Sequence, residues 1–212
     1  MKNGGEKRLG AKTPIITYLL IAANALIFFY MFGLSESALK VFIDKYGLIP
    51  TLIVQKENLY TLVTSMFLHG GLIHLGLNML FLLIAGDSCE RAMGHSRFLA
   101  FYLIAGVFSG LFYVYMNTAS SMTAIGASGA IFGVLAAFAI LFPFRIVISF
   151  VGFIPVPLPA IIFVLLSVWL ETVYVMTGAN PYVAHTAHIG GFLAGVFLTL
   201  LFGPSKPETE ET

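Results

Sequence analysis

The chain has 212 residues, of which 58% are hydrophobic and only 10% are charged, and its formal net charge is +1. A soluble domain could not shield so much apolar surface with so few charges, so the composition places the chain among integral membrane proteins. The balanced charge, with no basic stripe, excludes nucleic acid as a partner, and the single cysteine excludes an internal disulfide.

Six apolar segments along the chain are long enough to be membrane spans, since a helix needs about 20 mostly apolar residues to cross a bilayer. They lie at about 14–34, 70–86, 98–117, 125–143, 158–177 and 186–203. The alternation typical of an outer-membrane barrel is absent. We therefore expect an all-α integral membrane protein. Its six-transmembrane-helix bundle fills residues 14–203 and has an outer loop at 35–68, and 1–13 and 204–212 form cytoplasmic segments.

The Lys and Arg residues outside the spans predict the orientation of the bundle. With six spans, both termini lie on the same side of the membrane. That side carries Lys2, Lys7, Arg8, Lys12, Arg91, Arg97, Arg145 and Lys206, whereas the other side carries only Lys40, Lys45 and Lys56. We therefore expect a multi-pass protein of the cell membrane with both termini in the cytoplasm.

Two further patterns concern packing and the loops. The outer loop mixes apolar and charged residues, so we expect it to lie in the membrane interface or against the bundle. Pro155, Pro157 and Pro159 are expected to end regular structure before the fifth span. Glycine pairs four residues apart in the fourth and sixth spans favour close helix packing. These pairs are Gly129 with Gly133 and Gly191 with Gly195.

A few polar residues stand inside the apolar segments, where each needs a reason. His74 and Asn78 are four residues apart and share one face of the second span. Ser128 lies near the start of the fourth span and His188 near the start of the sixth. Even-numbered spans all run from outside to inside, so these groups lie about 5–12 Å below the outer boundary. Three separate segments therefore deliver polar groups to one depth.

This set suits nucleophilic catalysis. A serine hydroxyl becomes a good nucleophile when a base such as histidine takes its proton, which assigns Ser128 as nucleophile and His188 as base. Attack on a carbonyl creates an oxyanion, for which the His74 ring, the Asn78 amide and the Ser128 backbone N–H are suitable donors. We expect a dyad without a carboxylate, because no acid is evidently well placed. Glu171, in the fifth span, receives no role.

Two other histidines are accessory candidates. His69 is expected to be a structural histidine where the outer loop meets the second span, and His185 is expected to line the entrance to the site. A serine between glycines can also be a helix-packing residue, but the surrounding histidines favour chemistry for Ser128.

The motifs resemble those of the rhomboid intramembrane serine proteases. G-A-S-G at 126–129 resembles the nucleophile motif of that family, H-G-G-L-I-H-L-G-L-N at 69–78 resembles its H-x-x-x-N helix, and A-H-I-G-G at 187–191 resembles the segment with the base. The resemblance covers spans two to six. Where many members carry Trp-Arg in the first loop, this chain has Tyr60 and Thr61.

The resemblance implies a six-helix fold and a serine–histidine dyad that works without a metal or other cofactor. Ser128 corresponds to the nucleophile, His188 to the base, and His74, Asn78 and the Ser128 amide to the oxyanion hole. The implied partners are the lipid bilayer and the transmembrane helices of membrane-protein substrates, cleaved near the outer face. The oligomeric state is left open.

The alternative is a histidine-rich membrane metal-binding protein or transporter. His69, His74, His185 and His188 all lie toward the outer side, and histidine is a common zinc ligand. Against this, the H-E-x-x-H pattern of zinc proteases is absent, and we expect no acidic or thiol ligand beside these histidines.

Overall fold

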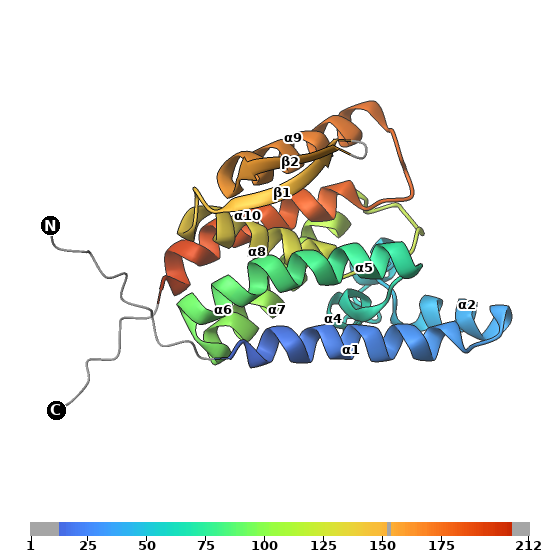
Figure 1. Cartoon of the computed structure of the whole chain (residues 1–212). Coiled ribbons are helices and arrows are strands. Elements are labelled where there is room, and N and C mark those ends of the chain that lie inside the picture. The colour runs from blue at the N-terminus through green and yellow to red at the C-terminus, as the bar shows by residue number, and fades with distance from the viewer. Residues whose placement is uncertain (1–12, 152–153, 205–212) are drawn as a thin grey trace, which may run out of the picture.

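The computed structural model describes residues 13–151 and 154–204, and it shows a helical bundle with one β-hairpin on its flank (Figure 1). Among the described residues, five helical stretches are long and apolar enough to cross a membrane. They are α1 (Ile15–Phe32), the continuous run Leu72–Met93, α7 (His95–Met116), α9 (Ala160–Thr177) and α10 (His185–Phe202). Together with a shorter apolar helix, α8 (Ser128–Leu141), they confirm the predicted helical membrane bundle.

The run Leu72–Met93 extends beyond its predicted end at residue 86. It consists of α5 (Leu72–Phe81), a π-helical turn η2 (Leu82–Gly86) and α6 (Asp87–Met93). The polar residues of α6 suggested a loop, but Ser88, Cys89 and Glu90 are buried. The helix therefore continues because the bundle supplies partners for these side chains.

Helix α8 is shorter than the predicted span 125–143. Gly126 has a φ of +129°, in a region that L side chains rarely adopt, and the helix begins only at Ser128. Its 14 residues extend about 21 Å, less than the ~30 Å hydrocarbon core of a bilayer. Most of α8 is buried, and it lies among the other helices (Figure 1). Because α8 is shorter than the helices around it, Ser128 at its start lies inside the bundle, short of the ends of the longer helices.

Close backbone packing joins α8 to α10. A Cβ on Gly191 would overlap the carbonyl oxygen of Gly129, and a Cβ on Gly195 would overlap that of Gly133. The hydrophobic effect gives little attraction between helices in lipid, so close van der Waals packing of this kind is what holds them together. The two helices that carry Ser128 and His188 are thereby held at short range.

The outer loop folds into short helices, namely α2 (Glu36–Tyr46), α3 (Pro50–Val54), α4 (Thr61–Thr64) and the 3-10 turn η1 (Ser65–Phe67). Leu48 pairs with Ala124 in an isolated β-bridge. The Tyr60 hydroxyl donates to the carbonyl of Lys45 at 2.9 Å, and the Thr64 hydroxyl donates to that of Tyr46 at 2.7 Å. These bonds tie α4 and the residue before it to the end of α2.

Strands β1 (Ile146–Val151) and β2 (Ile154–Pro159) form an antiparallel hairpin between α8 and α9. The expectation that prolines end regular structure here is wrong. Pro155, Pro157 and Pro159 occur at alternate positions of β2. In a two-stranded sheet, alternate N–H groups of each strand point away from the partner, so prolines at one parity remove no ladder hydrogen bond.

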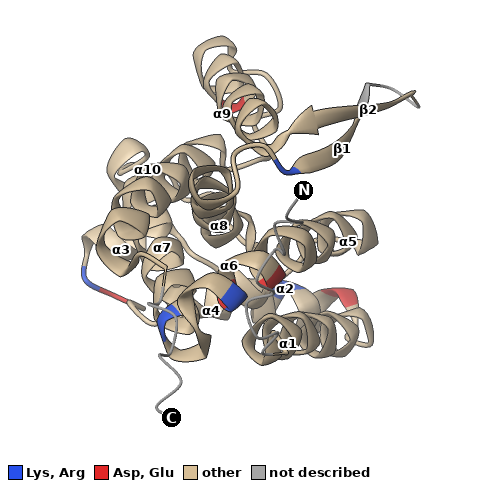
Figure 2. Cartoon of the chain, turned by 60° about the vertical axis from the view of Figure 1, so that its left-hand side comes forward, with Lys and Arg blue, Asp and Glu red and all other residues tan. Residues whose placement is uncertain are grey.

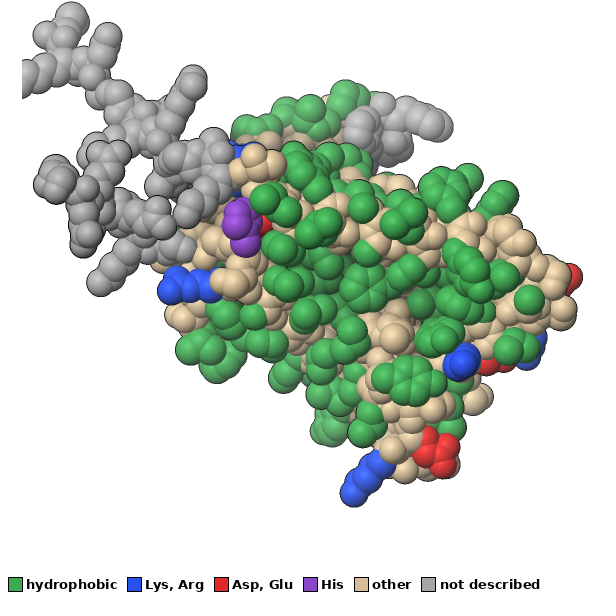
Figure 3. Space-filling view, turned by 90° about the horizontal axis from the view of Figure 1, so that it is seen from below, with side chains coloured by type: hydrophobic (Ala, Val, Ile, Leu, Met, Phe, Trp, Pro, Cys, Tyr) green, Lys and Arg blue, Asp and Glu red, His purple; other side chains and the backbone are tan. Residues whose placement is uncertain are grey.

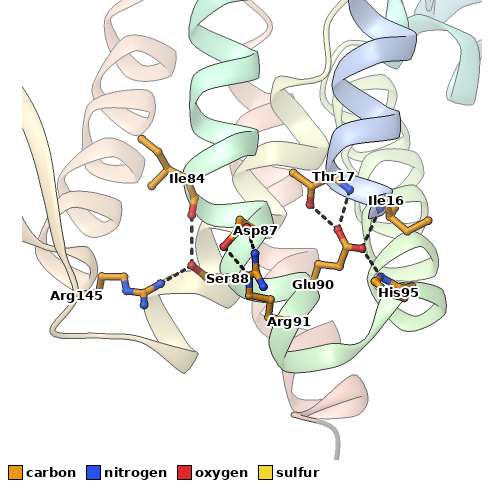
Figure 4. A network of polar contacts seen from close by, with 9 residues as sticks. All are labelled: Ile16, Thr17, Ile84, Asp87, Ser88, Glu90, Arg91, His95 and Arg145. Atoms are coloured by element: carbon orange, nitrogen blue, oxygen red, sulfur yellow. Dashed lines mark hydrogen bonds and ion pairs between the residues drawn. The ribbon is translucent and has the colours of Figure 1, made fainter. Parts of the chain in front are cut away.

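Glu90 ties α6 to the start of α1 (Figure 4). Its carboxylate accepts the backbone N–H groups of Ile16 and Thr17 at 2.9 and 2.7 Å, and the Thr17 hydroxyl at 2.7 Å. Pro14, the residue just before α1, has a side chain that cannot cap the helix. Glu90 therefore satisfies N–H groups that the helix itself leaves unpaired, and its charge complements the helix dipole.

The surface matches a lipid environment. Space-filling shows apolar side chains over most of the face seen in Figure 3, with the charged ones toward its edges. In Figure 2, charged residues lie mainly in loops and at helix ends, with an acidic residue on α9 as an exception. Lys2, Lys7, Arg8, Lys12 and Lys206, on which the predicted orientation partly depends, lie outside the described residues.

Candidate active site

Ser128 and His188 meet where α8 and α10 begin. The Nε2 atom of His188 lies 2.7 Å from Ser128 Oγ. Ser128 is the first residue of α8, so its backbone N–H has no intrahelical acceptor. His188 is 8% exposed. The pair thus has the nucleophile–base separation that proton transfer from serine requires.

The ring of His188 is held by an aromatic neighbour that the sequence analysis did not single out. Phe132, one turn after Ser128 on α8, stacks on the imidazole with centroids 4.6 Å apart and planes 5° from parallel. Ser128 and Phe132 share one helix face because they are four residues apart. That spacing was the signal in the sequence that could have identified Phe132.

Glu171 belongs to the same cluster, contrary to the expectation that no acid is well placed. Its Oε2 atom lies 2.5 Å from Nδ1 of His185 and 3.0 Å from Nδ1 of His188. The Glu171 side chain is only 13% exposed. The expectation failed because the last turns of α9, the loop 178–184 and the first turn of α10 separate Glu171 from His188 in the sequence. In an antiparallel hairpin of α9 and α10, residues on either side of the loop come to one level.

His185 is enclosed by acceptors rather than lining an open entrance. Its Nδ1 contacts the Glu171 carboxylate, and its Nε2 lies 3.1 Å from the backbone carbonyl oxygen of Asn180. Tyr174 of α9 stacks on the ring with centroids 4.7 Å apart. Side chains of α9 and a loop carbonyl therefore fix both nitrogens of His185.

The second histidine segment approaches Ser128 from α5. A Cβ at Gly126 would lie 2.8 Å from His74 Nε2 and 3.7 Å from Ser128 Oγ, so the His74 ring and the serine hydroxyl flank the same point. Asn78 is buried, and its Nδ2 donates to the His74 carbonyl at 2.9 Å. In this state the Asn78 amide is therefore engaged within its own helix.

His69 lies in the turn before α5 and supports the His74 ring. Its centroid is 5.0 Å from that of His74, with the two rings edge to face. It is 2% exposed, and neither ring nitrogen makes a hydrogen bond of good geometry with the described residues, although the ring lies beside the backbone of Phe67. Burial, assisted by the nearby His74, lowers the pKa of His69 to about 4. His69 is consequently neutral at physiological pH.

Glu171, His185 and His188 together offer three metal-ligand atoms, one from each residue, that lie within 4.8 Å of one another. The expectation that no acidic ligand accompanies the outer histidines is therefore wrong. However, ligands of a tetrahedral zinc at about 2.0–2.1 Å are separated by about 3.3 Å. The carboxylate–imidazole separations of 2.5 and 3.0 Å are shorter, so these groups contact one another directly.

Comparison with known proteins agrees with this architecture. The Rhomboid domain family matches residues 56–205. RHOMBOID-like protein 5 of Arabidopsis thaliana is 31% identical over 73% of this chain and 47% of its own length. Rhomboid protease AarA of Providencia stuartii is 31% identical over 65% of this chain and 54% of its own. Rhomboid protease GluP of Bacillus subtilis is 29% identical over 91% of this chain and 36% of its own.

The chain thus spans about half the length of these relatives or less. The matched region contains the Ser128–His188 pair, the histidine-bearing α5 and the hairpin with Glu171. On this match, the chain belongs to the rhomboid family.

Proposed function

We propose that the protein is an intramembrane serine endopeptidase that cleaves transmembrane segments of other membrane proteins. The observation that carries the proposal is the 2.7 Å contact between Ser128 Oγ and His188 Nε2 inside a bundle of apolar helices. A hydroxyl hydrogen-bonded to an imidazole is the arrangement that activates serine. Two matched relatives are named as rhomboid proteases, and another as a rhomboid-type serine protease.

The proposed reaction begins when Ser128 Oγ attacks a peptide carbonyl while His188 Nε2 takes the hydroxyl proton. The oxyanion is stabilised by the Ser128 backbone N–H and by His74, with Asn78 joining if its amide leaves the His74 carbonyl. His188 then gives its proton to the leaving amine, and the acyl-enzyme remains. Water activated by His188 finally hydrolyses the ester and regenerates the serine.

Water reaches this chemistry more easily near a membrane face than at the bilayer centre. Ser128 borders a cavity of about 40 Å³ that is also lined by Ser65, Ser109 and Ala187. A water molecule needs only about 10–15 Å³ of such volume and two or more polar partners. The cavity is therefore large enough to hold a water molecule beside Ser128, where it could hydrolyse the acyl-enzyme.

The substrate must unwind locally before attack, because an intact helix hides its carbonyls in internal hydrogen bonds. Helix-breaking residues near the scissile bond should therefore favour cleavage. From the distribution of Lys and Arg, we place both termini in the cytoplasm and the site toward the extracytoplasmic side of the cell membrane.

The test uses purified full-length protein in detergent, a fluorophosphonate probe and a model transmembrane substrate. We compare the wild type with Ser128→Ala and His188→Ala, each with and without a chelator. We expect labelling and cleavage by the wild type to survive the chelator, and both to disappear in the two variants. Cleavage that persists in Ser128→Ala, or that the chelator abolishes, would overturn the proposal and favour the metal-binding alternative.

A further inference from the structure

The mechanism of the proposed protease assigns no role to Glu171, although its carboxylate lies beside His188. It is the only charged residue in the sequence of α9, whose sole buried residues are Ala160 and Val164. A buried carboxylate in a membrane helix is costly unless it is paired. Its partners are both histidines at the start of α10.

Both hydrogen-bond partners of His185 are acceptors, and only one form of the ring can donate to both of them. Its two ring nitrogens face the Glu171 carboxylate and the Asn180 carbonyl, which as an ionised acid and a backbone oxygen are acceptors only. A neutral imidazole has one N–H donor, whereas the imidazolium has two. His185 satisfies both neighbours as the cation, and the Glu171–His185 pair is then an ion pair.

The contact of Glu171 with His188 is of a different kind. The two atoms are 3.0 Å apart, yet His188 Nδ1 has no hydrogen bond of good geometry with the described residues. In this resting state the carboxylate is beside the imidazole without being aligned to it. Hydrogen bonds of catalytic groups commonly tighten only when substrate is bound. A small rotation of either side chain would complete the bond.

We infer that Glu171 is a positioning residue for the base His188, and that the His185 imidazolium holds its carboxylate in place. An N–H···O bond from Nδ1 to Glu171 leaves Nε2 unprotonated and directed at Ser128 Oγ, the tautomer that the reaction needs. When Nε2 takes the serine proton, the carboxylate stabilises the positive charge that forms. This inference rests on the proposed function, and it extends the dyad to a chain of contacts Ser128–His188–Glu171–His185.

The charged and titratable groups that face His188 give the inference its test. Glu171 approaches from α9 and His185 from its own helix, and His74 of α5 is close enough to interact with it electrostatically. Removing the carboxylate should disfavour protonated His188, whereas removing the His185 charge should favour it. The two changes should therefore shift the acid limb of the kcat/KM profile in opposite directions.

We would measure kcat, KM and fluorophosphonate labelling between pH 5 and 9 for Glu171→Gln, Glu171→Asp and His185→Asn. Asparagine keeps a donor near the Nδ1 position of His185 without its charge. Thr172→Val, the exposed neighbour of Glu171 on α9, is the matched control.

For Glu171→Gln we expect a kcat about 10- to 100-fold lower, an unchanged KM and an acid limb about one pH unit lower. Glu171→Asp should restore the position of the limb and part of kcat. His185→Asn should move the limb to higher pH with a smaller loss of kcat, and Thr172→Val should match the wild type.

Two results would overturn the inference while leaving the proposed protease intact. One is an active Glu171→Gln with an unmoved acid limb. The other is a loss of kcat in Glu171→Gln that Glu171→Asp does not relieve although both variants remain folded. Removal of wild-type activity by a chelator, restored by zinc, would replace the positioning role by a metal site. An inactive, unlabelled wild type would instead refute the proposed function itself.

Discussion

Glu90 and Glu171 are two poorly exposed carboxylates of the same bundle, and their partners give them different properties. Glu90 is 1% exposed and accepts two backbone N–H groups and a hydroxyl from the start of α1. Glu171 is on the sparsely buried α9, and its partners are two imidazoles of α10. Backbone donors are permanent, whereas imidazoles gain and lose protons.

The difference explains what each carboxylate contributes. Two of the donors that join Glu90 to α1 are backbone N–H groups, which cannot move without unwinding a helix. The Thr17 hydroxyl and His95, whose Nδ1 lies 2.5 Å from Glu90 Oε1, complete the cluster (Figure 4). Glu171 can exchange its contacts without disturbing a backbone. The first arrangement suits a structural anchor, and the second suits a group that responds to the protonation of its neighbours.

The largest effect on stability is expected at Glu90. Glu90→Gln removes the charge and places an amide donor among N–H donors of α1, so we expect the free energy of unfolding to fall by about 3–5 kcal/mol. Equilibrium unfolding in mixed micelles measures this loss, with Glu171→Gln as the comparison. The contrast between the two carboxylates fails if Glu171→Gln is destabilised as much as Glu90→Gln.

His69 offers a third case, a buried titratable side chain whose ring nitrogens make no hydrogen bond of good geometry with the described residues. Its pKa of about 4 in the folded protein is below the ~6.5 of an unfolded histidine. The unfolded chain therefore binds the extra proton, and stability is lost as pH falls from about 6.5 to about 4, by about 3 kcal/mol in total.

Unfolding free energies of the wild type and His69→Asn at pH 7 and pH 4.5 test this assignment. The acid-induced loss of stability should be smaller in the variant, which has no imidazole to protonate. Equal losses in both proteins would show that other groups cause the acid sensitivity.

A smaller and more local effect is expected from the α8–α10 contact. In Gly195→Ala, the added Cβ would overlap backbone of Gly133, which cannot rotate away, so we expect a loss of about 1–3 kcal/mol. Because the helices must separate, labelling of Ser128 should also slow. The control is Gly76→Ala on α5, where a Cβ would meet nothing within 4 Å. A variant as stable and as reactive as the wild type would show that this contact does not hold the site.

The smallest effect should come from an ion pair in water. Lys40 and Asp44 of α2 are 3.2 Å apart, with side chains 80% and 52% exposed. Solvent screening leaves such pairs with little net contribution, and Asp44→Asn should change stability by less than about 0.5 kcal/mol. A loss comparable with that of Glu90→Gln would mean that burial does not distinguish the carboxylates of this protein.

The sequence alone sufficed to predict the membrane class, the order of the apolar segments and Ser128, His188 and His74 as candidate site residues. Hydropathy is a local property, so a span can be recognised from its own residues, and a polar group within one stands out against them. Positions near the starts of alternate spans also share a depth, whatever the packing of the helices.

Tertiary structure alone decided what depends on neighbours. The partners of Glu171 follow from the pairing of α9 with α10, and the late start of α8, at Ser128, follows from the backbone at Gly126. The β-hairpin depends on a register that places three prolines at one parity. Hydrogen bonds and close contacts join residues far apart in the chain, and no local pattern in the sequence records their distance or direction.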